Sequence, residues 1–170
     1  MLKRKIDKYL EEWKASADKK PLIVKGARQV GKTASIRYFG EKYYKYIVEI
    51  NFALQPKYKQ IFADGYEVDS IIKNITLLNP SLVVVPHETL LFFDELQEYP
   101  DCATSLKSFK QDGRYDVICT GSLMGLYYQQ IESNSVGYKT DYEMYSLDFE
   151  EFLWAKGYDE HFINDLYQHM

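Results

Sequence analysis

The sequence predicts an α/β protein in which helices cover both faces of a mostly parallel sheet of five strands. Short runs such as 90–93 (Leu-Leu-Phe-Phe) are apolar at every position, as in strands that are buried on both faces. These runs alternate with segments of helical spacing, which favours parallel strands. Chemically active residues follow directly after three of the runs, where parallel sheets bind their ligands.

The N-terminal elements begin with an amphipathic helix at 5–17. Apolar residues recur there at helical spacing: Ile6, Tyr9, Leu10 and Trp13. A short apolar strand is predicted at 21–25, behind a proline. The next helix covers 33–39, and Gly40 is expected to end it. A second strand is predicted at 46–52.

The middle of the chain continues the alternation. A helix is predicted over 68–78, and the apolar strand at 90–93 follows it. Leu106 and Phe109 indicate the next helix. A fourth strand covers 116–120, and Gly121 closes it.

The last quarter of the chain is more polar. We expect a helix over 122–131, a polar loop over 132–141, a fifth strand over 142–147 and a final helix over 148–155. The predicted organisation is an N-terminal helix and linker (1–20), a core of alternating strands and helices (21–147) and a C-terminal helical segment (148–170).

Length and composition are those of one ordinary globular domain. The chain has 170 residues, 46% apolar and 27% charged, with a net charge of −4. This charge argues against a large surface for sequence-independent nucleic-acid binding. Lysines alternate with tyrosines at 42–46, as in single-strand binders, but a solvated approach to a strand explains them better.

Localisation and metal binding follow from what the sequence lacks. The N-terminus has no signal-peptide pattern, and no apolar run is long enough to span a membrane. The two cysteines and three histidines have no zinc-type spacing. We therefore expect a cytoplasmic protein in a reducing environment, without membrane contact.

The most informative motif is a complete G-x-x-x-x-G-K-[ST] phosphate-binding loop at 26–33. The backbone N–H groups of such a loop cradle a β-phosphate, and the next helix adds its positive N-terminal end. Lysine would reach the β- and γ-phosphates, and the last hydroxyl would bind Mg²⁺. The candidate nucleotide-binding residues are Gly26, Ala27, Arg28, Gln29, Val30, Gly31, Lys32, Thr33 and Ala34.

Two adjacent carboxylates follow the third predicted strand. Asp94, at the strand tip, is expected to hold Mg²⁺ through water and to complete the metal site that Thr33 begins. Glu95 is expected to orient and polarise the water that attacks the γ-phosphate. An acidic turn after a strand is common, so the assignment depends on the phosphate loop upstream.

Three further polar residues lie at or just after the carboxyl ends of predicted strands. Thr120 is a candidate catalytic residue that would hydrogen-bond the attacking water or the γ-phosphate. Ser122 could do the same, or could cap the following helix. Asn51, at the end of the second strand, is a candidate to steer Glu95 through its amide.

The expected ligands are ATP and Mg²⁺. The chain has no Asn-Lys-x-Asp stretch for reading guanine, which favours ATP over GTP. Three functions stay open: an ATPase, a phosphotransferase that uses the same loop, and a non-catalytic module gated by nucleotide. Adjacent carboxylates favour water as the acceptor, and four arginines are few for a lid that clamps charge.

Several stretches together resemble AAA+-type ATPases that carry a poorly characterised C-terminal domain. They are 25–33, 92–97, 105–107, 120–122 and 144–153, in the same order. The resemblance covers nearly the whole chain. It implies sheet order 5-1-4-3-2, Asp94 as the Mg²⁺ carboxylate, Glu95 as the hydrolytic base and Thr120 at the sensor position.

The resemblance also implies partners. The family continues past this point with a helical segment and a second domain, so the chain corresponds to the N-terminal ATPase portion. The segment 137–139 lacks the arginine often found there, which leaves the arginine finger unassigned. The C-terminal domain or a neighbouring subunit would supply that cation. The macromolecular substrate, protein or DNA, stays open.

Overall fold

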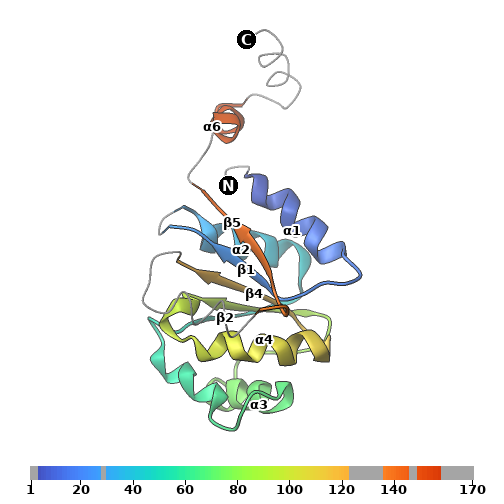
Figure 1. The fold of residues 1–170 in the computed structure, drawn as a ribbon, viewed down its shortest axis with the longest axis vertical. Helices are drawn as coiled ribbons and strands as arrows, with labels where there is room; N and C mark the ends of the chain where they lie inside the picture. Colours follow the sequence, from blue (N-terminus) through green and yellow to red (C-terminus); the bar gives the residue numbers. More distant parts are fainter. Residues whose placement is uncertain (1–3, 28–29, 123–135, 146–148, 158–170) are drawn as a thin grey trace.

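A computed structural model describes residues 4–27, 30–122, 136–145 and 149–157 (Figure 1). Within them, all strands pair in parallel in the order β2-β3-β4-β1-β5. Read from the other edge, this is 5-1-4-3-2, so the predicted fold class and strand order are confirmed. The strands are β1 (Leu22–Lys25), β2 (Tyr46–Asn51), β3 (Thr89–Asp94), β4 (Asp116–Gly121) and β5 (Thr140–Glu143).

Helices form an outer layer on each side of the sheet (Figure 1). One face carries α1 (Lys5–Ala15) and α2 (Lys32–Tyr43). The other carries the 3₁₀ segment η1 (Pro56–Phe62) with α3 (Val68–Leu78) and α4 (Asp101–Asp112). A short turn, η2 (Leu96–Glu98), follows β3, and α6 (Phe149–Ala155) follows β5.

The central strand β3 shows why the sequence pattern was informative. Leu90 and Phe92 pack into the core beneath α1 and α2, whereas Leu91 and Phe93 pack into the core beneath α3 and α4. All are fully buried. A strand with apolar residues on both faces has to lie between two helical layers.

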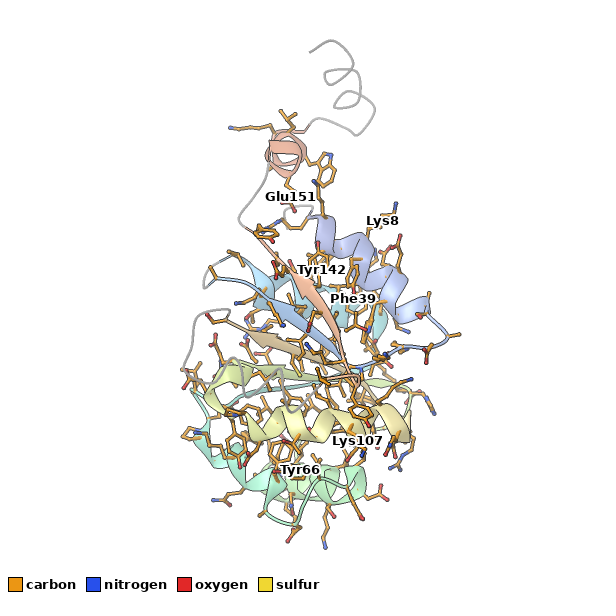
Figure 2. The ribbon with its side chains drawn as sticks, viewed as in Figure 1. Lys8, Phe39, Tyr66, Lys107, Tyr142 and Glu151 are labelled. Atoms are coloured by element: carbon orange, nitrogen blue, oxygen red, sulfur yellow. The ribbon has the colours of Figure 1, made fainter. Side chains whose placement is uncertain are left out.

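The two cores are also visible from the labelled side chains in Figure 2. Phe39 of α2 and Tyr142 of β5 belong to the core that α1 covers. Tyr66 packs against the opposite core, on the α3 side of the sheet. The sheet thus separates two hydrophobic clusters.

The prediction that Gly40 ends its helix is wrong, because α2 continues to Tyr43. Gly40 lies inside the helix at a close contact with the sheet. A Cβ at this position would lie 2.7 Å from Cδ1 of Ile47, so any larger residue would require the Ile47 side chain to move.

The predicted fifth strand, 142–147, begins two residues too late and ends four residues too late. β5 spans Thr140–Glu143, and Met144 and Tyr145 have already left the sheet. β5 lies at the sheet edge beside the four-residue strand β1, which limits the length of the pairing. Its alternation of half-buried and exposed residues explains why apolar content did not reveal it.

The remaining elements agree within one or two residues, except where the chain lies outside the described part. The helix expected at 122–131 falls there apart from Ser122. In the described part, no group of three or more metal-binding side chains is present. No helix in that part has the length and apolar character that crossing a membrane requires.

Candidate nucleotide-binding site

The carboxyl edge of the sheet brings the predicted motifs together. The loop at 26–31 leaves β1, Asp94 ends β3, and Thr120 lies in the last part of β4. In the register of the sheet, Lys25 lies opposite Gly121 and Asn51 lies opposite Asp94. The parallel strands therefore deliver these residues to one edge, as the sequence predicted.

Gly26 begins the loop in a position that admits no side chain. A Cβ there would lie only 2.4 Å from the carbonyl oxygen of Met144. Its N–H donates to the carbonyl oxygen of Gly121 at 3.2 Å. The first residue of the loop therefore lies in close contact with the ends of β4 and β5. These contacts fix the point at which the loop leaves the sheet.

Gly31 ends the loop and stands at the N-cap of α2 with φ 96°. Side chains rarely adopt this left-handed conformation, which explains the glycine. No side chain caps α2, and its first turn holds no acidic residue. The first N–H groups of a helix have no intrahelical partner, so this end of α2 suits an anion.

Lys32 is the buried cation of the site, with only 7% of its surface exposed. Its ammonium donates to the carbonyl oxygens of Gly26, Ala27 and Gly121, the latter two at 3.2 and 3.3 Å. The Lys32 side chain therefore folds back across the phosphate loop, so its ammonium would lie close to a phosphate bound there.

Thr33 and Asp94 connect the two predicted motifs. The Thr33 hydroxyl lies 3.3 Å from each carboxylate oxygen of Asp94, although the residues are 61 positions apart. Asp94 is 5% exposed. A hydroxyl and a carboxylate in this arrangement offer oxygen ligands of the kind that Mg²⁺ prefers.

Thr120 lies between the two acidic residues. Its hydroxyl donates to Asp94 and accepts the backbone N–H of Glu95 at 3.0 Å. Glu95 has φ 62°, a left-handed conformation that is costly for a side chain of this size. Such strain is typical of functional sites, and here the Thr120 contact holds the strained backbone in place.

Asn51 does not steer Glu95 as expected. Its amide nitrogen donates to Asp94 at 3.3 Å, and its amide oxygen accepts the N–H groups of Ala53 and Leu54. The physical reason is the sheet register, which places Asn51 opposite Asp94 and not opposite Glu95. Asn51 therefore fixes the orientation of the carboxylate that ends β3.

The other predicted nucleotide-binding residues are less informative. Arg28 and Gln29 lie outside the described residues. Ala27 and Ala34 are exposed, and Val30 is half-buried. Ser122 is described, but the helix it was expected to cap is not.

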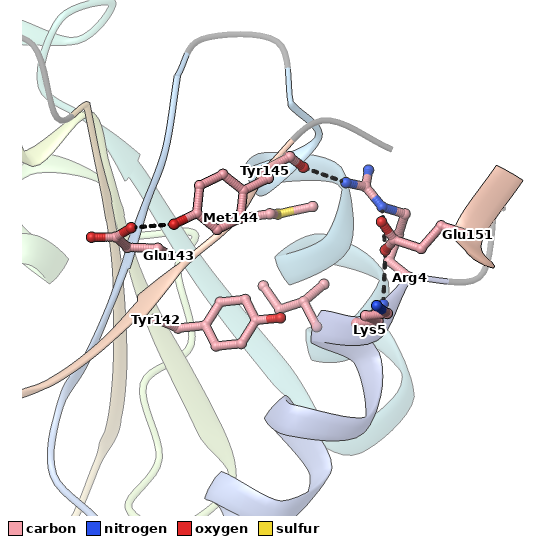
Figure 3. Close-up of a pocket in the computed structure, with 8 residues that line it drawn as sticks. Arg4, Lys5, Tyr142, Glu143, Met144, Tyr145 and Glu151 are labelled. Carbon is pink, nitrogen blue, oxygen red and sulfur yellow. Dashed lines mark hydrogen bonds and ion pairs between the residues drawn. The ribbon is translucent and has the colours of Figure 1, made fainter. Parts of the chain in front are cut away.

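Sequence reasoning missed Arg4, which reaches the loop from the start of α1. One guanidinium nitrogen donates to the carbonyl oxygen of Val30 at 2.9 Å. Another donates to the carbonyl oxygen of Tyr145 at 2.8 Å (Figure 3). The third, Nε, lies 2.8 Å from Glu151 of α6. These contacts join segments far apart in the chain, so no local pattern announces them.

A pocket of about 250 Å³ adjoins the loop at this point (Figure 3). Burial raises the pKa of Tyr142 in its wall, and a hydrogen bond to Glu143 raises the pKa of Tyr145. Both phenols are therefore neutral at physiological pH. The lining residues are Arg4, Lys5, Ile6, Tyr142, Glu143, Met144, Tyr145 and Glu151.

Comparison with known proteins gives a family match and distant matches among solved structures, two of which are described here. Residues 18–153 match the AAA domain family. No curated protein matches the sequence. PCH-2 of C. elegans has 13% identity and a TM-score of 0.49, over 82% of this chain and 41% of that chain. The Orc1 protein of Aeropyrum pernix, solved in complex with DNA, has 12% identity and a TM-score of 0.49, over 81% and 43%. The chain thus spans less than half of either structure.

Proposed function

Because the chain belongs to the AAA domain family, we propose that this ATPase-like nucleotide-binding domain binds ATP with Mg²⁺ and hydrolyses it. One observation carries the proposal. The last hydroxyl of the phosphate loop, on Thr33, faces the carboxylate that ends β3, on Asp94. Phosphate loop and acidic strand end are then two halves of one site.

The residues fit a Mg²⁺ ion between these two side chains. The hydroxyl of Thr33 and the carboxylate oxygens of Asp94 lie 3.3 Å apart and are the oxygen ligands that Mg²⁺ prefers. Thr33 would hold the ion directly, and Asp94 would hold it through water. When bound, the ion would neutralise charge on the phosphate oxygens.

The chain's own residues then have separate tasks. Lys32 exchanges its contacts with loop carbonyls for the β- and γ-phosphates, while the N–H groups of the loop hold the β-phosphate. Glu95 orients the attacking water and accepts its proton. Thr120 acts as a positioning residue, because its hydroxyl is engaged by Asp94 and by the Glu95 backbone.

The pocket beside the loop is the proposed site for the base and ribose. Its volume of about 250 Å³ is below the ~300–1,000 Å³ of pockets that enclose a whole ligand. It borders the loop at Arg4 and Met144, both of which closely approach loop glycines. A nucleotide whose phosphates fill the loop would therefore extend its remaining part into this pocket.

Calorimetry with Mg-ATP tests the binding. We expect Lys32→Ala to weaken binding by about 1.5–3 kcal/mol, because a charge-assisted contact is lost. Lys42→Ala is the matched control, since this lysine lies on the same helix with its side chain 54% exposed. Equal affinity of both variants and the wild type would exclude the assignment.

Phosphate release without any added acceptor tests the hydrolysis. Water as acceptor gives steady release of inorganic phosphate from Mg-ATP alone. A phosphotransferase would need a second substrate, and a non-catalytic module would bind nucleotide without turnover.

A further inference from the structure

Arg4 contacts three chain segments that are remote from one another in sequence. Its guanidinium binds the Val30 carbonyl of the phosphate loop. It also binds the Tyr145 carbonyl after β5 and the Glu151 carboxylate of α6 (Figure 3). The side chains of Arg4 and Glu151 are 10% and 7% exposed. A buried ion pair is stable only when further hydrogen bonds satisfy both charged groups. The planar guanidinium of arginine can make several such hydrogen bonds at once.

Glu151 makes a second contact with the same end of α1. The oxygen that pairs with Arg4 also accepts the backbone N–H of Lys5, the first residue of α1, at 2.9 Å. This N–H has no partner inside the helix, and a negative charge is favourable at a helix N-terminus. Glu151 therefore attaches α6 to α1 and to Arg4 together.

The Val30 carbonyl, which accepts a hydrogen bond from Arg4, belongs to the same peptide unit as the N–H of Gly31. A hydrogen bond to the carbonyl fixes this peptide and makes its N–H a stronger donor. The N–H groups of a phosphate loop are the groups that hold the phosphates. Arg4 thus acts on the phosphates through the loop backbone.

We propose that Arg4 is a positioning residue of the phosphate loop, and that Glu151 makes its position depend on the attachment of α6. Filling the loop with phosphate and attaching α6 to α1 then stabilise each other. This inference rests on the proposed nucleotide binding and adds its coupling to the C-terminal helix. Such coupling is reciprocal, so it is measurable from both ends.

The first measurement is the ATP dissociation constant of the 170-residue chain, with Mg²⁺, by calorimetry. We expect Glu151→Gln and Arg4→Lys each to raise it about tenfold, as for loss of a charged hydrogen bond. The double variant should be little worse than either, because both changes break one unit. Asp69→Asn is the matched control: Asp69 also pairs with an arginine, Arg114, which precedes β4 at the opposite edge of the sheet. It should bind like the wild type.

The second measurement is hydrogen exchange at 149–157 with and without Mg-ATP or Mg-pyrophosphate. Both ligands should slow exchange in α6 of the wild type, and neither should do so in Glu151→Gln. Pyrophosphate separates coupling through the loop from direct contact of a base with the pocket. Unchanged protection of β3 in the variant shows that the fold is intact.

The outcomes separate the two proposals. If the wild type binds no ATP, both the proposed function and the coupling are overturned. If the wild type binds ATP and both variants bind it equally well, the coupling alone is overturned. Protection of α6 by ATP but not by pyrophosphate also overturns it, because the signal would not pass through the loop.

Discussion

The hydroxyl of Thr120 accepts the backbone N–H of Glu95 at 3.0 Å while it donates to the carboxylate of Asp94. One side chain on β4 thereby fixes the positions of both acidic residues at the end of β3, Asp94 and Glu95. The contact also holds Glu95 in a left-handed conformation that costs about 1–3 kcal/mol. The geometry of the proposed metal and water sites thus depends on a neighbouring strand.

Thr120→Val should lower kcat much more than it changes KM, because the substrate still binds while Glu95 loses its orientation. It should also reduce the free energy of unfolding by about 1–3 kcal/mol, since a buried N–H loses its acceptor. Thr120→Ser keeps the hydroxyl and should restore most of the turnover. Steady-state kinetics and urea unfolding measure both. If Thr120→Ser and Thr120→Val lower kcat equally, the Thr120 hydroxyl does not position Glu95.

Glu95→Gln should keep ATP bound but reduce turnover by about 10²–10⁴-fold, as for removal of a general base. Calorimetry and phosphate release measure the two effects separately. Glu98→Gln removes an exposed carboxylate from the following turn and serves as control. Wild-type turnover in Glu95→Gln would eliminate Glu95 as the base.

Asp94→Asn should weaken the dependence of ATP binding on Mg²⁺, because the amide replaces a charged oxygen ligand. We expect the affinity ratio with and without Mg²⁺ to approach one, measured by calorimetry in excess EDTA and in excess Mg²⁺. Asp64→Asn changes an exposed aspartate and should leave the ratio unaltered. An unaltered ratio in Asp94→Asn would place the metal elsewhere.

Turnover of this chain at nanomolar concentration should be slow. An arginine that stabilises the transition state is worth about 10³–10⁵ in rate. Among the described arginines, Arg4 is held by Glu151, Arg37 pairs with Glu49, and Arg114 precedes β4 at the opposite edge. We therefore expect the cation to come from a second copy of the chain or from a further domain.

This expectation is tested by the specific activity of the chain over a range of chain concentrations. A specific activity that rises with concentration supports a cation from a second copy. If the chain at nanomolar concentration already has the specific activity that it has at micromolar concentration, and turns over at about 1 s⁻¹ or faster, as typical enzymes do, the site is complete within one chain and the expectation is wrong.

Cys102 and Cys119 should react with a thiol reagent only when the fold opens. Both are fully buried, and burial raises the pKa of Cys102 well above its usual range, so little thiolate forms. Because ATP binds only the folded state, it should slow the labelling further. Time-resolved labelling with and without Mg-ATP measures this. Rapid labelling of the native chain would contradict the burial of both thiols.

The fold was predictable because its central strands are apolar at every position. β3 shows this best, since Leu90 to Phe93 fill both cores and no other arrangement buries them all. β5 was misplaced for the opposite reason, because an edge strand with polar, half-exposed residues carries a weak pattern. Gly40 misled because glycine serves close packing as well as helix ends.

The candidate site also contains residues that the sequence predicted and one, Arg4, that it did not. Motifs at fixed spacing placed Lys32 and Thr33, and parallel topology brought Asp94 beside them. Arg4 was not predictable, because its partners lie 26, 141 and 147 positions away along the chain. Contacts of this kind depend on the completed fold and leave no local periodicity.

The strand order also has a consequence for synthesis on the ribosome. β1 lies between β4 and β5, so the phosphate loop emerges first but its neighbours Thr120 and Met144 emerge about 100 residues later. At roughly 5–20 residues per second, the apolar segment Leu22–Val24 waits about 5–20 s for its partners. During that interval the nascent chain exposes an apolar segment to which chaperones can bind. Nucleotide can stabilise the domain only after nearly the whole sheet has been made.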